Sequence, residues 1–77
     1  MPRYFFHTQN DETVRDENGH ELPDSNAAKA EAVAMMGEML RDRARDFWAS
    51  GRLRVTVEGG GGDTVVVLTT RVEEAPN

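Results

Sequence analysis

The 77-residue sequence contains no cysteine, so neither a disulfide framework nor a thiolate zinc site can stabilise the fold. It has no apolar run near the roughly 20 residues that span a bilayer, and its N-terminal stretch lacks the apolar segment of a secretory signal. We therefore expect a cytoplasmic protein without membrane contacts. A domain this short buries only about 60 to 65% of its unfolded surface, which favours self-association as a source of further buried area.

Positive charge is also scarce. The chain has nine Lys and Arg residues against 14 Asp and Glu residues, and its formal net charge is −5. This excess of negative charge opposes binding to the phosphates of nucleic acids or to an anionic membrane surface. Nucleic acid and membranes are therefore not expected as partners, although Arg52 and Arg54 can form a local basic patch.

One long helix is predicted between Pro23 and Gly51. Asp24 or Ser25 can serve as its N-cap, and residues 27–32 are rich in strong helix formers. Gly51 can adopt the left-handed conformation that ends a helix. At 1.5 Å per residue this helix would be roughly 35 to 40 Å long, more than a domain of this size needs.

The helical pattern contains two apolar strips. The main strip, which we expect to pack on a sheet, consists of Val33, Met36, Leu40, Ala44 and Phe47, with Ala30 and Trp48 at its margin. A second, narrower strip consists of Ala28, Ala32, Met35 and Met39. Because methionine adapts its shape to a partner, we interpret the second strip as a candidate subunit contact.

Strand patterns lie on both sides of the helix. Residues 3–8 and 13–16 form a predicted hairpin, and a second hairpin joins 52–58 to 64–72 through the glycine-rich loop 59–62. The alternation in 52–58 directs every second, apolar residue inward. The sequence therefore predicts an α+β fold in which two β-hairpins form one mainly antiparallel sheet and a single long helix packs on one face, in the order β-β-α-β-β.

We expect one domain over residues 1–72 and a flexible acidic tail over 73–77. The first strand is aromatic on both faces, which favours a place inside the sheet. Phe5 and His7 then lie on the face that the helix does not cover. An uncovered apolar face is a second candidate contact surface.

Two segments resemble a known family. M-P-R-Y-F-F-H at residues 1–7 and D-E-N-G-H-E-L-P-D at 16–24 are similar to motifs of short bacterial proteins of unknown function, which open with M-P-R-Y-(F/Y)-F-H and carry D-E-x-G-x-E-L-P-D before an alanine-rich helix. The resemblance covers about the first 40 residues and departs at the loop 59–62. It implies no activity. A weaker likeness to HicB-type antitoxins, in which a small sheet leads through Pro-Asp into a helix, implies at most an antitoxin-like scaffold.

Potential chemical groups gather in the N-terminal hairpin. Asp16, Glu17 and Asp24 are explained as turn and cap residues that accept hydrogen bonds from nearby backbone N–H groups. Neither an H-E-x-x-H motif nor a nucleophile elbow is present, so we expect no enzyme and no catalytic, cofactor-binding or metal-binding residues. The full set is His7, His20, Asp11, Glu12, Asp16, Glu17 and Glu21.

The function predicted from these observations is a small acidic protein-interaction module that self-associates and needs no cofactor. Two alternatives stay open: an antitoxin-like inhibitor of a basic partner, and a weak metal or small-ligand binder that uses His7 and His20. The predicted interaction surface consists of Met35, Met39, Ala28, Ala32, Phe5 and His7.

Overall fold

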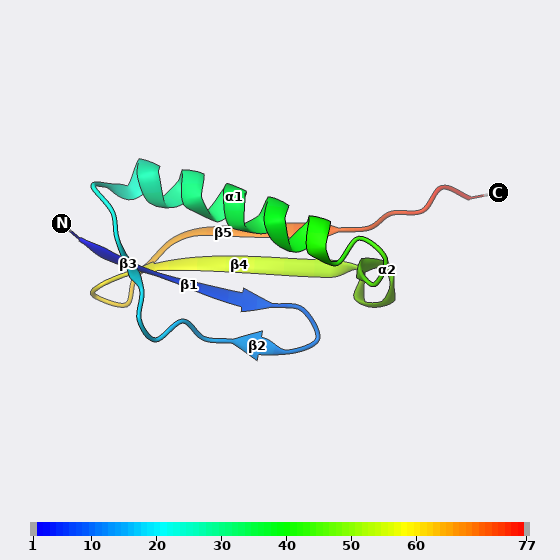
Figure 1. Ribbon diagram of the computed structural model, residues 1–77, viewed down its shortest axis with the longest axis horizontal. Coiled ribbons are helices and arrows are strands. Elements are labelled where there is room, and N and C mark those ends of the chain that lie inside the picture. Colours follow the sequence, from blue (N-terminus) through cyan, green and yellow to red (C-terminus); the bar gives the residue numbers. More distant parts are fainter. Residues whose placement is uncertain (1, 77) are drawn as a thin grey trace.

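The computed structural model describes residues 2–76, which form one antiparallel sheet with a helix across one face (Figure 1). The predicted α+β class with one antiparallel sheet is confirmed. The predicted order β-β-α-β-β is incomplete, because the chain has a third short strand before the helix and a second short helix after it. The elements are β1 (Arg3–Gln9), β2 (Thr13–Val14), β3 (His20–Glu21), α1 (Ser25–Asp42), α2 (Phe47–Ser50), β4 (Arg52–Gly59) and β5 (Thr64–Arg71).

The aromatic strand β1 lies inside the sheet, as predicted. One edge of β1 pairs with β4 along most of its length, and the other edge is shared by two short strands. Thr8 and Gln9 pair with β2, whereas Arg3 and Tyr4 pair with β3. Among the described strands the order is β2–β1–β4–β5, and β3 pairs with the same edge of β1 as β2 does. One edge of the sheet is therefore formed by β2 and β3, and the other by β5.

The hydrophobic core lies between α1 and one face of the sheet. The alternation along β4 holds: Leu53, Val55 and Val57 are at most 1% exposed, and each contributes roughly 1.5 to 3 kcal/mol by its burial. The opposite face carries no helix in Figure 1, and we call it the open face. The core consists of Tyr4, Phe6, Ala28, Ala32, Met36, Leu53, Val55 and Val57.

The helix face that packs on the sheet differs from the predicted one. Ala28 and Ala32 are fully buried, whereas Val33 is 60% exposed. Small alanines at these positions allow the backbone of α1 to lie close to β4 and β5. The strip interpreted as a subunit contact is therefore the one that faces the sheet.

The predicted main strip is only partly correct. Met36 is buried, and Leu40 and Phe47 pack against the core. Trp48 is 63% exposed, and its predicted place at the margin of a packed strip is wrong. Ala30 and Ala44 are exposed as well.

The helix also ends earlier than predicted. The C-cap of α1 is Arg43, whose N–H donates to the carbonyl of Met39 at 3.1 Å. Residues 43–46 form a turn, because this polar stretch offers no side chain that holds the helix to the sheet while the chain reverses towards β4. The predicted Gly51 stop is confirmed, with φ 71° and an N–H bond of 2.7 Å to the carbonyl of Phe47, but it ends α2.

The C-terminal residues 73–76 are exposed and belong to no helix or strand, and Figure 1 shows this segment extending away from the sheet. Arg71 forms an ion pair with Glu73 there. Flexibility of the tail stays a prediction, and Asn77 lies outside the described residues. None of the helices in residues 2–76 has the length and apolar character needed to cross a membrane.

Candidate functional site

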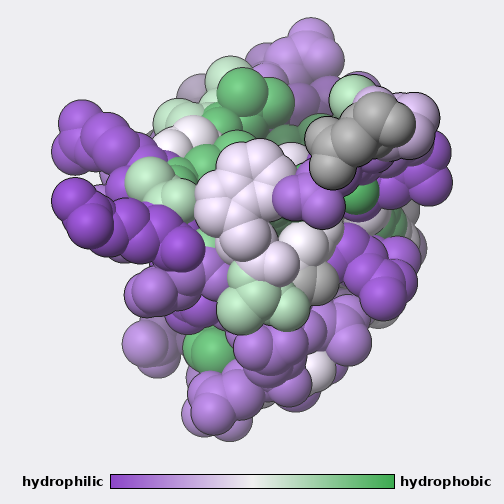
Figure 2. Space-filling model, turned by 90° about the vertical axis from the view of Figure 1, so that its right-hand side faces the viewer, coloured by the Kyte–Doolittle hydropathy of each residue, from purple (hydrophilic) through white to green (hydrophobic). Residues whose placement is uncertain are grey.

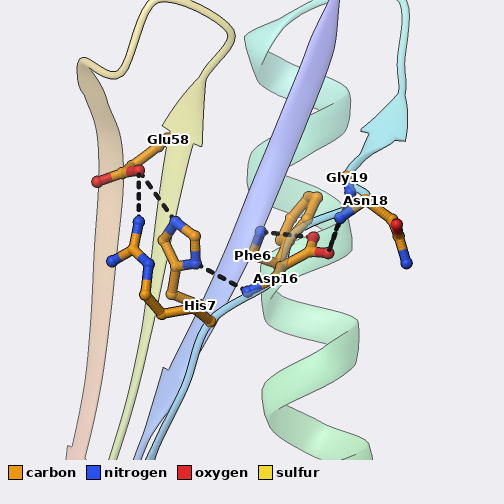
Figure 3. Close-up of polar contacts among 7 residues, drawn as sticks. Phe6, His7, Asp16, Asn18, Gly19 and Glu58 are labelled. Carbon is orange, nitrogen blue, oxygen red and sulfur yellow. Dashed lines mark hydrogen bonds and ion pairs between the residues drawn. The ribbon is translucent and has the colours of Figure 1, made fainter.

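His7 of β1 and the residues that follow β2 form a polar network that reaches Glu58 of β4 (Figure 3). The backbone N–H of Asp16 donates to Nδ1 of His7 at 3.0 Å, and Nε2 of His7 lies 2.9 Å from Oε1 of Glu58. Because Nδ1 accepts a hydrogen bond, a neutral ring carries its proton on Nε2 and donates it to the carboxylate. A guanidinium nitrogen of Arg15 lies 3.8 Å from the same Glu58 oxygen.

The carboxylate of Asp16 substitutes for a missing strand between β2 and β3. Oδ2 accepts from the N–H of Phe6 at 3.0 Å, and Oδ1 accepts from the N–H groups of Asn18 at 3.1 Å and Gly19 at 3.0 Å. Burial by itself raises the pKa of Asp16, but these three N–H donors and the charge of His20 outweigh it, so the pKa lies below 3.8. The charged form of Asp16 therefore holds the loop to β1.

Gly19 permits the loop to lie flat on β1. Its φ is +72°, and a Cβ atom there would come within 2.8 Å of the carbonyl oxygen of Tyr4. One guanidinium nitrogen of Arg3, Nη1, donates to the carbonyl of Asn18 at 2.7 Å, and the other, Nη2, pairs with Oε1 of Glu21 at 3.1 Å. The D-E-N-G-H-E segment thus acts as a structural clasp along the edge of β1.

The two histidines do not form one metal site. His20 pairs with Tyr4, and its ring lies edge-on to Phe6 with centroids 5.8 Å apart, on the side of the sheet that faces α1. His7 lies on the open face beside Glu58. No group of three or more His, Asp or Glu side chains suited to a metal ion occurs among the described residues. His7 and His20 therefore lie on different faces of the sheet, and binding of a metal or small ligand through them stays a prediction.

The residues of the predicted interaction surface are not brought together. Ala28 and Ala32 are fully buried residues of α1, so they are not available to a partner. Met35 and Met39 are partly buried against the core. Phe5 is half-buried on the open face, far from the helix strip, and His7 is only 8% exposed. A contact through Met35 or Met39 stays a prediction.

The exposed edge of β5 is a feature that the sequence analysis overlooked. The N–H of Val72 donates to the carbonyl of Gly51 at 3.0 Å, just beyond the last paired residues of β4 and β5. Hydrogen-bonded pairs alternate with non-hydrogen-bonded pairs along an antiparallel ladder. The residues of β5 that bond to β4 are therefore Val66, Leu68 and Thr70.

The intervening residues direct their backbone groups outward. Val67, Thr69 and Arg71 point their N–H and C=O groups away from β4, and no described strand lies beyond them. Val67 is 45% exposed. The sequence carries no clear signal for this edge, because residues 65–68 are apolar without alternation and the edge position of β5 follows only from the strand order.

A family model described as a domain of unknown function (DUF6894) matches residues 3–71. The chain belongs to this family. The match spans β1 to the end of β5, so the clasp and the β5 edge both lie within the family domain. Neither the curated proteins nor the solved structures include a significant match.

Proposed function

We propose that this DUF6894 domain is a small protein-interaction module that self-associates through the edge of β5. The observation that supports this most strongly is the edge itself, an eight-residue strand with no charged side chain from Thr64 to Thr70. Its outward N–H and C=O groups have no partner strand among residues 2–76. Such an edge is a ready template for a further strand.

The edge lacks the features that usually protect a sheet from pairing. Proteins protect edges with proline, inward-pointing charges, bulges or covering loops. In β5 the register shift lies at the start of the strand, opposite Val57 and Glu58, and residues 66–71 then pair regularly with β4. The second half of the strand is therefore regular and accessible.

We propose that the strand that pairs with β5 is β5 of a second copy, related to the first by a two-fold axis at Thr69. In this antiparallel register Thr69 faces Thr69 of the other copy, and Val67 faces Arg71 of the other copy. All three residues direct their hydrogen-bonding groups outward, so each facing pair can exchange two backbone hydrogen bonds. The small core of a short domain gains buried area by this association.

Proline at position 69 tests the proposal. Thr69→Pro removes an outward N–H without touching the bonds between β4 and β5, and proline is tolerated at that kind of position in an edge strand. Thr69→Ala is the matched control, because it shortens the side chain and keeps the N–H. We expect a molar mass that is a multiple of 8.6 kDa for the wild type and Thr69→Ala, and 8.6 kDa for Thr69→Pro.

Light scattering with circular dichroism on each sample decides the outcome. A folded Thr69→Pro variant that keeps the wild-type oligomeric mass would place the contact elsewhere. A wild type that stays at 8.6 kDa over the whole concentration range would remove self-association altogether.

A further inference from the structure

Three arginines gather at the end of the sheet next to α2. Arg52 and Arg54 alternate with the buried Leu53 on β4, so both side chains lie on the open face. Arg71 on β5 is the partner of Arg52 across the ladder. We call Arg52, Arg54 and Arg71 the arginine corner.

The arginine corner places like charges where they oppose folding. Arg52 and Arg71 form a non-hydrogen-bonded pair, the closer kind, with Cα atoms about 4.5 Å apart. Like charges directly opposite in a sheet are destabilising. The chain has only nine cationic side chains and a net charge of −5, yet three of them lie here. This concentration of positive charge on an acidic chain makes the corner a candidate site for an anion.

The three arginines differ in the partners that they have within the chain. Glu73 in the exposed tail pairs with Arg71. Arg54 has no ion pair or side-chain hydrogen bond with another residue in the described part of the chain. Figure 2, which looks onto this end of the molecule, shows strongly hydrophilic side chains projecting from the surface. Arg54 is therefore available to an external anion.

A cavity of about 280 Å³ adjoins these side chains and is lined by Gln9, Asn10, Asp11, Arg52 and Arg54. Gln9 is the partner of Arg54 across the ladder. The side-chain oxygen of Asn10 accepts from the N–H of Glu12 at 2.9 Å, which leaves the Asn10 amide N–H groups for a ligand. The cavity thus combines guanidinium and amide donors in a volume suited to a small molecule.

We propose that this cavity binds a small anion with two or more negative charges carried on carboxylate or phosphate groups. The guanidinium of Arg54 holds one charged group in a forked pair of hydrogen bonds, and Arg52 and Arg71 attract the remaining charge. Asp11 at the rim weakens binding by repulsion. The site is independent of the pairing of β5, because it uses side chains on the open face.

The test is a calorimetric titration of the full chain with citrate and, separately, with inorganic phosphate. We expect saturable binding of at least one of them, and the stronger of the two identifies carboxylate or phosphate as the preferred group. Arg54→Gln should weaken binding by about tenfold or more, since it removes a charged hydrogen-bond donor. Asp11→Asn should strengthen binding, and Lys29→Gln, which removes the same charge from the distant start of α1, should leave it unchanged.

The opposite signs expected for Arg54→Gln and Asp11→Asn make the result specific. If neither anion binds, or if Lys29→Gln weakens binding as much as Arg54→Gln, the proposed site is wrong. An acetylated tetraglutamate peptide that binds far more tightly than citrate would also overturn it, because the corner would then be a docking surface for an acidic protein segment. Repeating the titration with Thr69→Pro separates this site from self-association.

Discussion

Replacing Asp16 should release the clasp along β1. The Asp16 carboxylate accepts hydrogen bonds from the backbone N–H groups of Phe6, Asn18 and Gly19. A hydrogen bond to a charged group contributes about 1.5 to 3 kcal/mol, and water replaces part of that at a half-exposed site. We therefore expect Asp16→Ala to lower the free energy of unfolding by about 2 to 4 kcal/mol, against a typical total of about 5 to 15 kcal/mol.

Asp16→Asn removes the negative charge of the side chain and keeps its size and shape. Its amide oxygen can still accept from Asn18 and Gly19, but its NH₂ group then faces the N–H of Phe6, and two donors cannot bond to each other. We expect a loss of about 1 to 2 kcal/mol by urea unfolding at pH 7. Glu17→Gln, the same change at the exposed neighbouring residue, is the control and should alter stability by less than about 0.5 kcal/mol.

The pH dependence follows from the lowered pKa of Asp16. In the unfolded chain this carboxyl titrates near its ordinary value of 3.8, and in the folded chain it titrates lower. The stabilisation by the charged form is therefore complete above the unfolded pKa and is lost as the pH falls through the folded pKa. The difference in unfolding free energy between wild type and Asp16→Asn should shrink over that range. A difference that is absent at pH 7, or constant down to about pH 2, would refute the role given to this carboxylate.

Three further predictions concern the fold. Gly19→Ala should cost about 1 to 3 kcal/mol in chemical unfolding, because φ is +72° and the new Cβ meets the carbonyl of Tyr4; a neutral result would show that the loop is free to move. Asp24→Ala should cost about 1 kcal/mol, since the 2.9 Å bond from Asp24 Oδ1 to the N–H of Ala27 caps α1; Asp24→Asn should retain most of that stability. Ala32→Lys should unfold the chain or lower its melting temperature strongly, whereas Val33→Lys should change stability by less than about 0.5 kcal/mol; equal effects would contradict the helix face described above.

Local backbone chemistry was largely readable from the sequence. Of the two predicted N-cap candidates, Asp24 caps α1, and Gly51 is confirmed as a helix stop, because each depends on a side chain or conformation within a few residues. The interpretation of Asp16 as a turn residue is confirmed as well, through Asn18 and Gly19. Its bond to Phe6, ten residues away, required the fold and was not predicted.

The buried face of α1 was harder to predict, because two of its buried residues are small alanines and the larger apolar residues Val33 and Trp48 are exposed. Hydrophobicity alone favours Val33 and Trp48 over alanine, yet a helix that lies close to β4 and β5 needs small residues at the contact. Ala28 and Ala32 therefore occupy the buried positions. The early end of α1 has a similar cause, since helix propensity in the stretch after Leu40 does not compensate for the absence of side chains that contact the sheet.

The candidate surfaces depended on strand order, which the sequence does not determine. The patch at Arg52 and Arg54 was foreseen from the alternation of β4, but the addition of Arg71 needed the register between β4 and β5. The free edge of β5 likewise follows only from its place as the last strand of the sheet. The packing of the strip with Ala28 and Ala32 against the sheet likewise follows only from the fold.

Amide hydrogen exchange at Thr69 tests the central claim most directly. If β5 pairs with a second copy, the outward N–H of Thr69 is protected at high protein concentration, and its protection falls on dilution together with that of Val67. The N–H of Thr70, which bonds to β4, stays protected throughout and serves as the internal reference. Exchange of the Thr69 amide at the unprotected rate at every concentration, with Thr70 still protected, would contradict self-association through this edge.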